Sequence, residues 1–151
     1  MNNKSTRSSL EKNSPVFTLG VASELSGIQT SSIRQYIDRG LIIPYKKETG
    51  RHLFSQEDIN RLKYIHRQLN EAGLNIAGIK ALLALIPCWA IHKCSINDRQ
   101  NCESFHSVTA PCWEASQKGR ECKNKNCREC DVYRIFEDYQ DLKSLIKVLT
   151  T

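Results

Sequence analysis

The sequence lacks a long apolar run and a leader-like start, and these two absences exclude several classes of protein. Its longest apolar stretch, from Ala81 to Ile86, is six residues long and ends at Pro87, whereas a membrane-spanning helix needs about 20 apolar residues. The first ten residues, MNNKSTRSSL, contain no apolar region of a secretory signal. We therefore predict a cytoplasmic protein without a membrane partner.

Motifs of the common enzyme classes are also missing. The chain has no glycine-rich phosphate loop, and no cysteine–histidine pair stands out as a nucleophile with its base. Cys127 and Cys130 have the C-x-x-C spacing of thiol–disulfide enzymes, but no βαβ pattern surrounds them. We therefore predict no enzymatic activity, and a thiol redox or electron-carrier protein is the least supported alternative.

The composition is that of an ordinary globular chain with a basic excess. The 151 residues are 40% hydrophobic and 25% charged, which is close to the average for globular domains and enough to build a core. A net charge of +6 hints at a polyanionic partner. Residues 1–14 are rich in Ser, Asn and Lys without apolar periodicity, so we predict a disordered arm there.

Residues 15–54 contain the pattern of two short helices followed by a hairpin. Thr18 is a potential N-cap of the first helix, and Gly27 is expected to end it. The segment QTSSIRQYIDRGLI carries its apolar residues on one helical face, with Gly40 after its end. Two such helices joined by a tight turn predict a helix-turn-helix. Alternating residues on both sides of Thr49 and Gly50 predict a β-hairpin.

Two more helices are expected before residue 87. Ser55 and Asp58 stand at the N-cap and N3 positions of a helix over residues 55–71, close to a capping box in which Asp replaces Glu or Gln. Asn75 caps another helix, which is apolar on most sides and therefore expected to be buried. These patterns predict a mainly α fold class, with a helix-turn-helix, a β-hairpin and two further helices over residues 15–86.

The second helix and the hairpin carry side chains suited to DNA. Short hydroxyls, a guanidinium and an amide lie off the apolar face of the helix and suit phosphates and base edges. Basic residues of the hairpin suit the flanking phosphate backbone. The alternative is a polar face that is merely solvated. The candidate DNA-binding residues are Thr18, Thr30, Ser31, Ser32, Arg34, Gln35, Tyr36, Lys46, Lys47, Arg51 and His52.

The stretch FTLGVASELSGIQTSSIRQYIDRGLIIP, continued by TGRHLFSQEDINRLKYIHRQLNEAGLNIAGIKALL, resembles the MerR family of winged-helix transcription regulators over roughly residues 16–86. Within it, VASELSG, SIRQYIDRGLI and GLNIAGIK are most similar to the branch that includes the actinobacterial-type heat-shock repressors. The resemblance implies a winged helix-turn-helix domain of four helices plus a β-hairpin wing. It also implies binding to double-stranded DNA as a homodimer on a palindromic operator, with RNA polymerase as a further partner.

The resemblance also implies roles for single residues. The family's recognition-helix arginine and tyrosine fall on Arg34 and Tyr36. Its wing arginine falls on His52, and the neighbouring Arg51 is available for that phosphate contact. MerR activators twist DNA to realign promoter elements, whereas the heat-shock branch represses, and the residues leave the sign of regulation open.

All seven cysteines lie after residue 87, in a segment of different character. Residues 87–131 lose the apolar periodicity and are dominated by Cys, Asn, Lys and Arg, so they offer too little apolar surface for a core of their own. In a reducing cytosol, clustered cysteines are more often metal ligands or redox centres than structural disulfides. A structural zinc contributes on the order of 10 kcal/mol to folding. We therefore predict a metal-binding or redox segment here.

The cysteine spacing divides this segment into two candidate sites. Cys122, Cys127 and Cys130 have the C-x4-C-x2-C spacing found in plant-type ferredoxins, with Cys112 as the expected fourth ligand. Structural zinc sites typically show two close cysteine pairs and this chain has one, which favours an iron–sulfur cluster and leaves zinc open. The second, looser group comprises Cys88, Cys94 and Cys102, with His92 and His106 nearby. Three alternatives are open for it: it takes one imidazole and binds zinc, it stays free, or one set supplies a ligand to the other.

Two further patterns flank these cysteines. The triplet Pro-Cys-Trp occurs at residues 87–89 and again at 111–113, and its tryptophans are suited to shield a site from water. From Val132 to Leu149, apolar residues alternate at spacings of three and four, which predicts an amphipathic C-terminal helix over residues 132–151. This helix is expected either to pair with a second copy of the chain or to fold back on its own subunit.

Together these patterns predict a transcription regulator of the MerR type, modulated by a metal or iron–sulfur centre. The cysteine segment lies in the chain between the DNA-binding domain and the candidate dimer helix, so building or losing the centre is expected to act as a switch. The alternative is a DNA-binding module whose zinc sites are purely structural.

Overall fold

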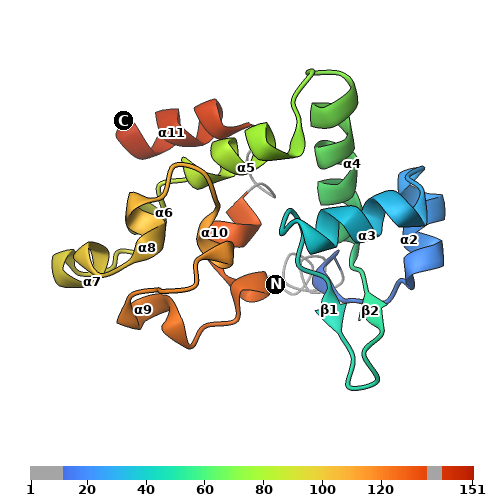
Figure 1. The fold of residues 1–151 in the computed structure, drawn as a ribbon, viewed down its shortest axis with the longest axis horizontal. Helices are drawn as coiled ribbons and strands as arrows, with labels where there is room; N and C mark the ends of the chain where they lie inside the picture. The colour runs from blue at the N-terminus through green and yellow to red at the C-terminus, as the bar shows by residue number, and fades with distance from the viewer. Residues whose placement is uncertain (1–11, 136–140) are drawn as a thin grey trace, which may run out of the picture. The chain divides into compact units, whose positions relative to one another are not determined.

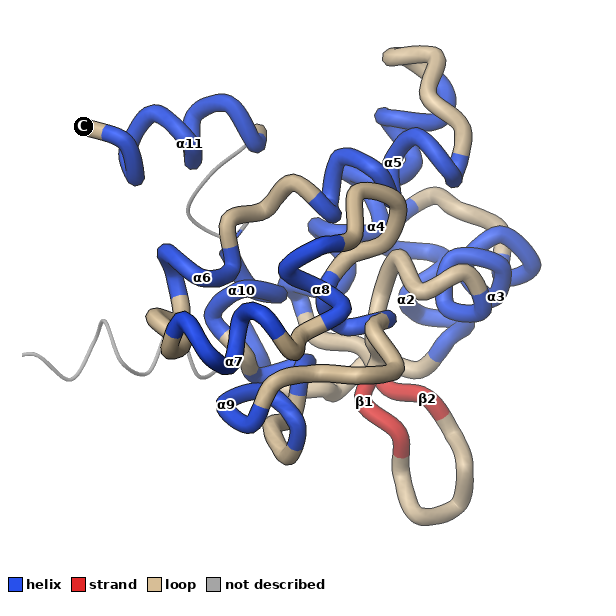
Figure 2. Tube along the Cα trace, turned by 60° about the vertical axis from the view of Figure 1, so that its left-hand side comes forward, coloured by secondary structure: helices blue, strands red, loops and turns tan. Residues whose placement is uncertain are grey.

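The computed structural model describes residues 12–135 and 141–151 (Figure 1). In these ranges the chain is mainly helical and contains one two-stranded antiparallel sheet, as the tube view also shows (Figure 2). The chain divides into two compact units, Met1–Gly73 and Leu74–Thr151, which are described separately. No helix in the described ranges is long and apolar enough to cross a membrane.

The first unit opens with the predicted helix-turn-helix. Helix α2 (Leu19–Ser26) begins at Thr18, whose hydroxyl oxygen accepts a hydrogen bond from the Val21 amide at 3.3 Å. It ends at Gly27, where a φ of 73° favours glycine because other residues rarely adopt it. Helix α3 (Thr30–Asp38) follows after this short turn, and both predicted helices are confirmed.

The predicted hairpin is confirmed as well. Strand β1 (Tyr45–Lys46) pairs antiparallel with β2 (His52–Leu53), with Tyr45 opposite Leu53 and Lys46 opposite His52. The turn is closed by a hydrogen bond of 2.9 Å from the Gly50 amide to the Lys47 carbonyl, and Gly50 has a φ of 86°. This geometry explains why glycine is suited to the tip.

Helix α4 (Gln56–Asn70) begins at the predicted capping box. The Asp58 amide donates to the Ser55 hydroxyl at 3.1 Å, and the Ser55 amide donates to the Asp58 carboxylate at 2.8 Å. Helix α2 packs against both α3 and α4. The buried apolar side chains of this unit are Ala22, Ile28, Ile33, Tyr36, Leu41, Ile42, Phe54, Ile59, Leu62 and Ile65.

Replacing Ser55 by alanine tests how much this cap contributes. The buried Asp58 amide would lose its acceptor, so we expect the free energy of unfolding to fall by about 1–2 kcal/mol. Urea unfolding followed by circular dichroism measures the change. The matched control is Gln56→Ala at the next, exposed position, which we expect to stay within roughly 0.5 kcal/mol of wild type. Equal effects of both substitutions would contradict the prediction.

The second unit starts with a longer helix, α5 (Ile76–Ala84), capped by Asn75 as predicted. Ile79, Leu83 and Ile86 are buried, but Leu82 and Leu85 are exposed. The prediction that this helix is buried on most sides is therefore wrong for one of its faces.

Short helices make up the rest of this unit. None of the apolar core residues falls between residues 87 and 131, which agrees with the sequence-based expectation of little apolar burial there. The elements in order are α6 (Cys88–Ile91), α7 (Ile96–Gln100), α8 (Glu103–His106), η1 (Cys112–Glu114), α9 (Arg120–Lys123), η2 (Cys127–Glu129), α10 (Asp131–Arg134) and α11 (Leu142–Thr150).

The expectation of one continuous helix from residue 132 to the C-terminus is wrong. Asp141 has extended backbone angles, φ of −153° and ψ of 157°, and its carboxylate accepts a hydrogen bond from the Ser144 amide at 2.8 Å. A separate helix therefore begins after Asp141, and the predicted helix does not continue through this residue. Helix α11 buries Leu145, whereas Ile146 and Leu149 of the predicted apolar seam are exposed, as is Val148. Tyr139, one residue of the predicted apolar seam, lies outside the described residues.

The structure does not test two of the predicted segments along their full length. Most of the predicted N-terminal arm, residues 1–11, lies outside them. The two compact units divide at Gly73, before the expected end of the DNA-binding domain at residue 86, so that expected boundary stays a prediction.

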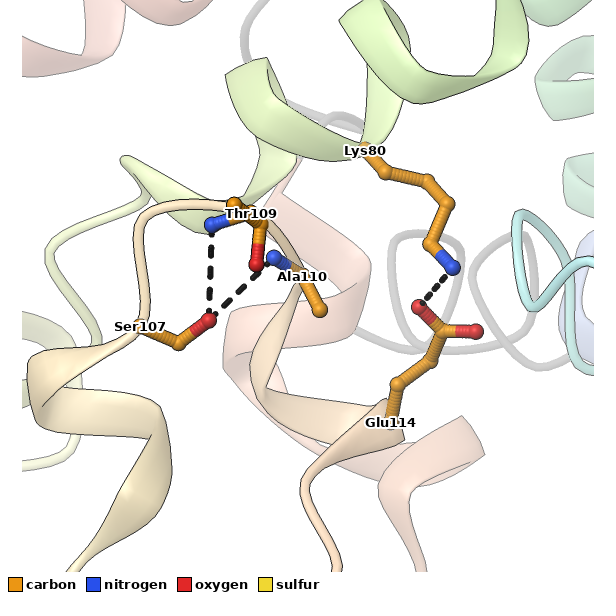
Figure 3. A network of polar contacts seen from close by, with 5 residues as sticks. All are labelled: Lys80, Ser107, Thr109, Ala110 and Glu114. Atoms are coloured by element: carbon orange, nitrogen blue, oxygen red, sulfur yellow. Dashed lines mark hydrogen bonds and ion pairs between the residues drawn. The ribbon is translucent and has the colours of Figure 1, made fainter.

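Polar contacts hold the loop that enters η1 (Figure 3). The Ser107 hydroxyl accepts hydrogen bonds from the amides of Thr109 at 3.4 Å and Ala110 at 3.3 Å. Farther on, the Lys80 ammonium on α5 forms an ion pair of 2.8 Å with the Glu114 carboxylate. The second half of the cysteine segment is thereby tied to a helix that precedes it in the chain.

Candidate nucleic-acid interface and cysteine cavity

Helix α3 carries five of the eleven predicted DNA-binding side chains away from its buried face. Ser31, Arg34 and Gln35 are exposed, while Thr30 and Ser32 are half-buried. Ile33 on the opposite face is fully buried, so the helix is anchored by its apolar side and presents a cation, an amide and hydroxyls to solvent. These groups can donate and accept hydrogen bonds at phosphates and base edges.

Tyr36 lies on the core-facing side of α3, and its part in DNA binding stays a prediction. Its side chain is only 3% exposed, and its hydroxyl lies 3.3 Å from Nδ1 of His66 on α4. Burial raises the pKa of the Tyr36 phenol. The reason for this position is its spacing of three from Ile33, which puts both side chains on the same, core-facing side of α3.

The hairpin places its basic residues at the surface of the first unit. Figures 1 and 2 show β1 and β2 extending away from helices α2, α3 and α4. Lys46, Lys47 and Arg51 are exposed, whereas His52 is half-buried in its strand. Arg51 thus has the exposure that the predicted phosphate contact requires. Thr18 is exposed too, and its hydroxyl serves as the cap of α2.

The structure brings all seven cysteines to the wall of one cavity of about 50 Å³ in the second unit. They are free thiols, and each is half-buried. The two groups that the spacing separates are therefore not separated in space. His92 also lines this cavity, whereas His106 does not and instead contacts the Gln100 carbonyl at 3.3 Å. The lining cysteines are Cys88, Cys94, Cys102, Cys112, Cys122, Cys127 and Cys130.

The local electrostatics keep the most enclosed thiols protonated at neutral pH. Burial, followed by the charges of neighbouring thiols, raises the pKa of Cys112 to about 12 and that of Cys122 to about 11. Burial also raises the pKa of Cys88. A metal that binds these sulfurs must displace their protons, because the thiolate is the ligand.

Basic side chains share the cavity wall with the thiols. The Lys118 ammonium donates to the Cys127 sulfur at 3.1 Å, and the Lys125 ammonium contacts the ring of His92. Arg99 also lines the cavity, and its Nε donates to the Cys94 carbonyl at 3.2 Å. Such cations can offset the negative charge of several thiolates.

The thiols line the wall without meeting at one point. In the described part of the chain, no three Cys, His, Asp or Glu side chains are gathered closely enough to hold a single metal ion. The described residues thus do not form a preorganised tetrahedral site for one ion. Their sulfur donors are nevertheless of the type that soft metals prefer.

The backbone at Gly119 passes close to the backbone of Asp98 in the second unit, and a larger residue at position 119 would not fit there. A Cβ at this position would lie 2.9 Å from the Asp98 carbonyl oxygen, which belongs to the backbone and cannot move aside cheaply. We expect Gly119→Ala to destabilise this unit by about 1–3 kcal/mol, with faster hydrogen exchange at residues 96–123.

The control for this substitution is Gly20→Ala in α2. A Cβ there meets nothing within 4 Å, and alanine favours a helix by up to about 1 kcal/mol over glycine. Unchanged exchange in Gly119→Ala would show that the contact with Asp98 is not needed.

The two helices, their tight turn, the hairpin and the exposed face of α3 define a protein of the helix-turn-helix class. Residues 17–86 match the family model described as "MerR HTH family regulatory protein". The chain therefore contains a MerR-family helix-turn-helix domain.

Curated relatives match about half of the chain. The chain is 33% identical over 76 residues to "Putative heat shock protein HspR" of Streptomyces coelicolor, covering 50% of each protein. It is 34% identical over 74 residues to "HTH-type transcriptional regulator GlnR" of Bacillus anthracis, covering 49% of this chain and 57% of that one. It is 34% identical over 68 residues to "Heavy metal-dependent transcription regulator 2" of Rhizobium meliloti, covering 44% and 46%.

The chain thus spans about half the length of the curated relatives it matches. The identities of 33% and 34% are nearly equal, so they do not separate the heat-shock branch from the others, and that branch stays a prediction.

Proposed function

We propose that this protein is a DNA-binding transcription regulator of the MerR type whose activity responds to a metal centre in its cysteine cavity. The observation that carries the first part is the polar, exposed face of α3 within a MerR-family domain. The convergence of seven thiols on one cavity supports the second part.

For DNA binding, α3 enters the major groove with its exposed face. Arg34 and Gln35 contact base edges or phosphates there, and the hydroxyls of the first turn contact the backbone. Lys46, Lys47 and Arg51 of the hairpin neutralise phosphates beside the groove, so that affinity falls with salt. Binding to a palindromic operator requires a homodimer. RNA polymerase is the expected partner at a promoter.

For metal binding, the donor set fits an iron–sulfur cluster or zinc. Thiolates are the preferred ligands of both. The residues that would hold such a group are among the seven cavity cysteines, with Lys118 and Lys125 offsetting negative charge. When bound, it would supply either a redox change or a structural cross-link. The name of the Rhizobium meliloti relative, which includes heavy-metal dependence, agrees with this assignment.

The proposed function is tested by measuring DNA binding in two states of the same protein. A duplex is first selected from a random pool with anaerobically purified full-length protein. Fluorescence anisotropy then compares the metal-loaded and the chelated protein, and transcription in vitro compares their outputs. We expect specific binding, and a difference between the two states in affinity or in transcript level.

The DNA-binding part and the metal-response part of the proposal can be disproved separately. A protein that selects no sequence contradicts the DNA-binding assignment. Equal affinity and equal transcript levels in the two states would make the centre purely structural, which is the zinc alternative, and would remove the sensing role only.

A further inference from the structure

The cysteine segment is an internal repeat that is longer than the Pro-Cys-Trp triplet. After the first triplet, Cys94 and Cys102 are separated by seven residues, and an aromatic residue, Phe105, stands three positions after Cys102. After the second triplet, Cys122 and Cys130 are again separated by seven residues, and Tyr133 stands three positions after Cys130. Each half thus contributes three cysteines in the same order.

The two halves also share their local structure. Cys88 and Cys112 each begin a short helix, α6 and η1, directly after a proline. Cys102 and Cys130 are each the N-cap of a four-residue helix, α8 and α10. The repeat is therefore one of structure as well as of sequence.

An equivalent aromatic contact closes each half. Trp89 packs edge-on against Phe105, with ring centroids 5.2 Å apart and an interplanar angle of 78°. Trp113 packs in the same way against Tyr133, at 5.0 Å and 86°. In both halves, the tryptophan after the first cysteine thus contacts the aromatic residue after the third.

The contacts between the halves are reciprocal. The first helix of the first half, α6, packs against the last helix of the second half, α10. The last helix of the first half, α8, packs against the first helix of the second half, η1. Two equivalent units that are related by a two-fold axis make every contact twice. The first helix of one unit packs against the last helix of the other, and the reverse.

The cysteines of both halves face a common cavity. Cys88 of the first half and Cys112 of the second half line the same wall as the other cysteines of the repeat. Six equivalent thiols exceed the four that complete a tetrahedral ion, and they line a wall instead of converging on a point.

We propose that the two halves of the repeat together hold one polynuclear metal–thiolate centre, with ligands from both halves, and that Cys127 is not needed to hold it. The inference rests on the metal-binding part of the proposed function. Cys127 has no counterpart: five positions after Cys94, where its equivalent would stand, the chain has Arg99. Its sulfur instead accepts a hydrogen bond from Lys118 at 3.1 Å.

The first test uses the unaltered full-length chain. Metal-free protein receives less than saturating zinc, or ferrous iron with sulfide, under anaerobic conditions, and native mass spectrometry counts the metal ions on each chain. One shared centre predicts two populations, metal-free and fully loaded, because the halves bind cooperatively. A dominant half-loaded species would show two independent sites and overturn the proposal.

The second test compares three single substitutions. We expect Cys88→Ser and Cys112→Ser, one from each half, each to lose the whole centre, and Cys127→Ser to keep it. The ferredoxin-like set of Cys112, Cys122, Cys127 and Cys130 predicts the opposite ranking: Cys88→Ser would keep its metal and Cys127→Ser would lose it. That result would overturn the proposal.

DNA binding of the same preparations separates this inference from the proposed function. Protein that holds one shared centre but selects no DNA sequence leaves the inference standing and contradicts the regulator. Protein that selects DNA but takes up neither metal contradicts the inference and leaves the DNA-binding assignment standing.

Discussion

Replacing Arg34 by alanine is expected to weaken binding to the selected duplex by roughly tenfold to a hundredfold, the range of a good contact to a base edge or of a phosphate contact in the groove. Arg34 lies on the exposed face of α3, between Ile33 and Tyr36, which are buried. Its removal therefore takes a cation from the interface and no apolar volume from the core. The free energy of unfolding should stay within roughly 0.5 kcal/mol of wild type.

Anisotropy titrations at several salt concentrations measure this effect. The matched control is Arg67→Ala, which removes another exposed arginine, near the end of α4, without touching α3 or the hairpin. We expect the control to bind like wild type. If both substitutions weaken binding equally, the loss of affinity reflects net charge, and α3 is not the helix that contacts the bases.

Removal of the proposed metal is expected to loosen residues 87–134 while residues 17–73 keep their protection. Apart from Pro111, this segment buries no large apolar side chain completely, and its packing rests mainly on two edge-on aromatic pairs. A thiolate-bound structural metal contributes on the order of 10 kcal/mol, which exceeds the total stability of many domains. The first unit has its own buried core around Phe54 and Leu62 and does not depend on the cysteines.

Hydrogen exchange followed by mass spectrometry, with and without a chelator, measures this difference segment by segment. Returning zinc, or ferrous iron with sulfide, to the chelated sample is the control and should restore the protection. Unchanged exchange in the cysteine segment after the metal has left would show that its own packing suffices, and the metal would then have no part in its folding.

The parts of the fold that could be predicted are those whose signals are local. Thr18, Ser55 and Asn75 cap their helices because a short polar side chain reaches an amide three residues on, which is a property of neighbours in the chain. The turn at Gly50 follows in the same way from the positive φ there. These elements were predictable without any knowledge of distant contacts.

Two parts of the sequence carry signals for more than one local structure or role. The apolar seam from Val132 to Leu149 has helical periodicity, but Asp141 lies within it and caps a new helix instead. Tyr36, a candidate DNA-binding residue, also shares the apolar face of α3 with Ile33, and its side chain is buried. In both cases two signals compete, and the local packing decides between them.

The order of the amino acids was enough to predict the helix-turn-helix and its hairpin, because caps, turns and periodicity act between near neighbours. The shared cavity of the seven thiols and the reciprocal contacts of the two halves follow from the packing of the second unit and could not be predicted in this way. The distance between residues far apart in the chain depends on how short helices pack, and cysteine spacing alone does not encode it.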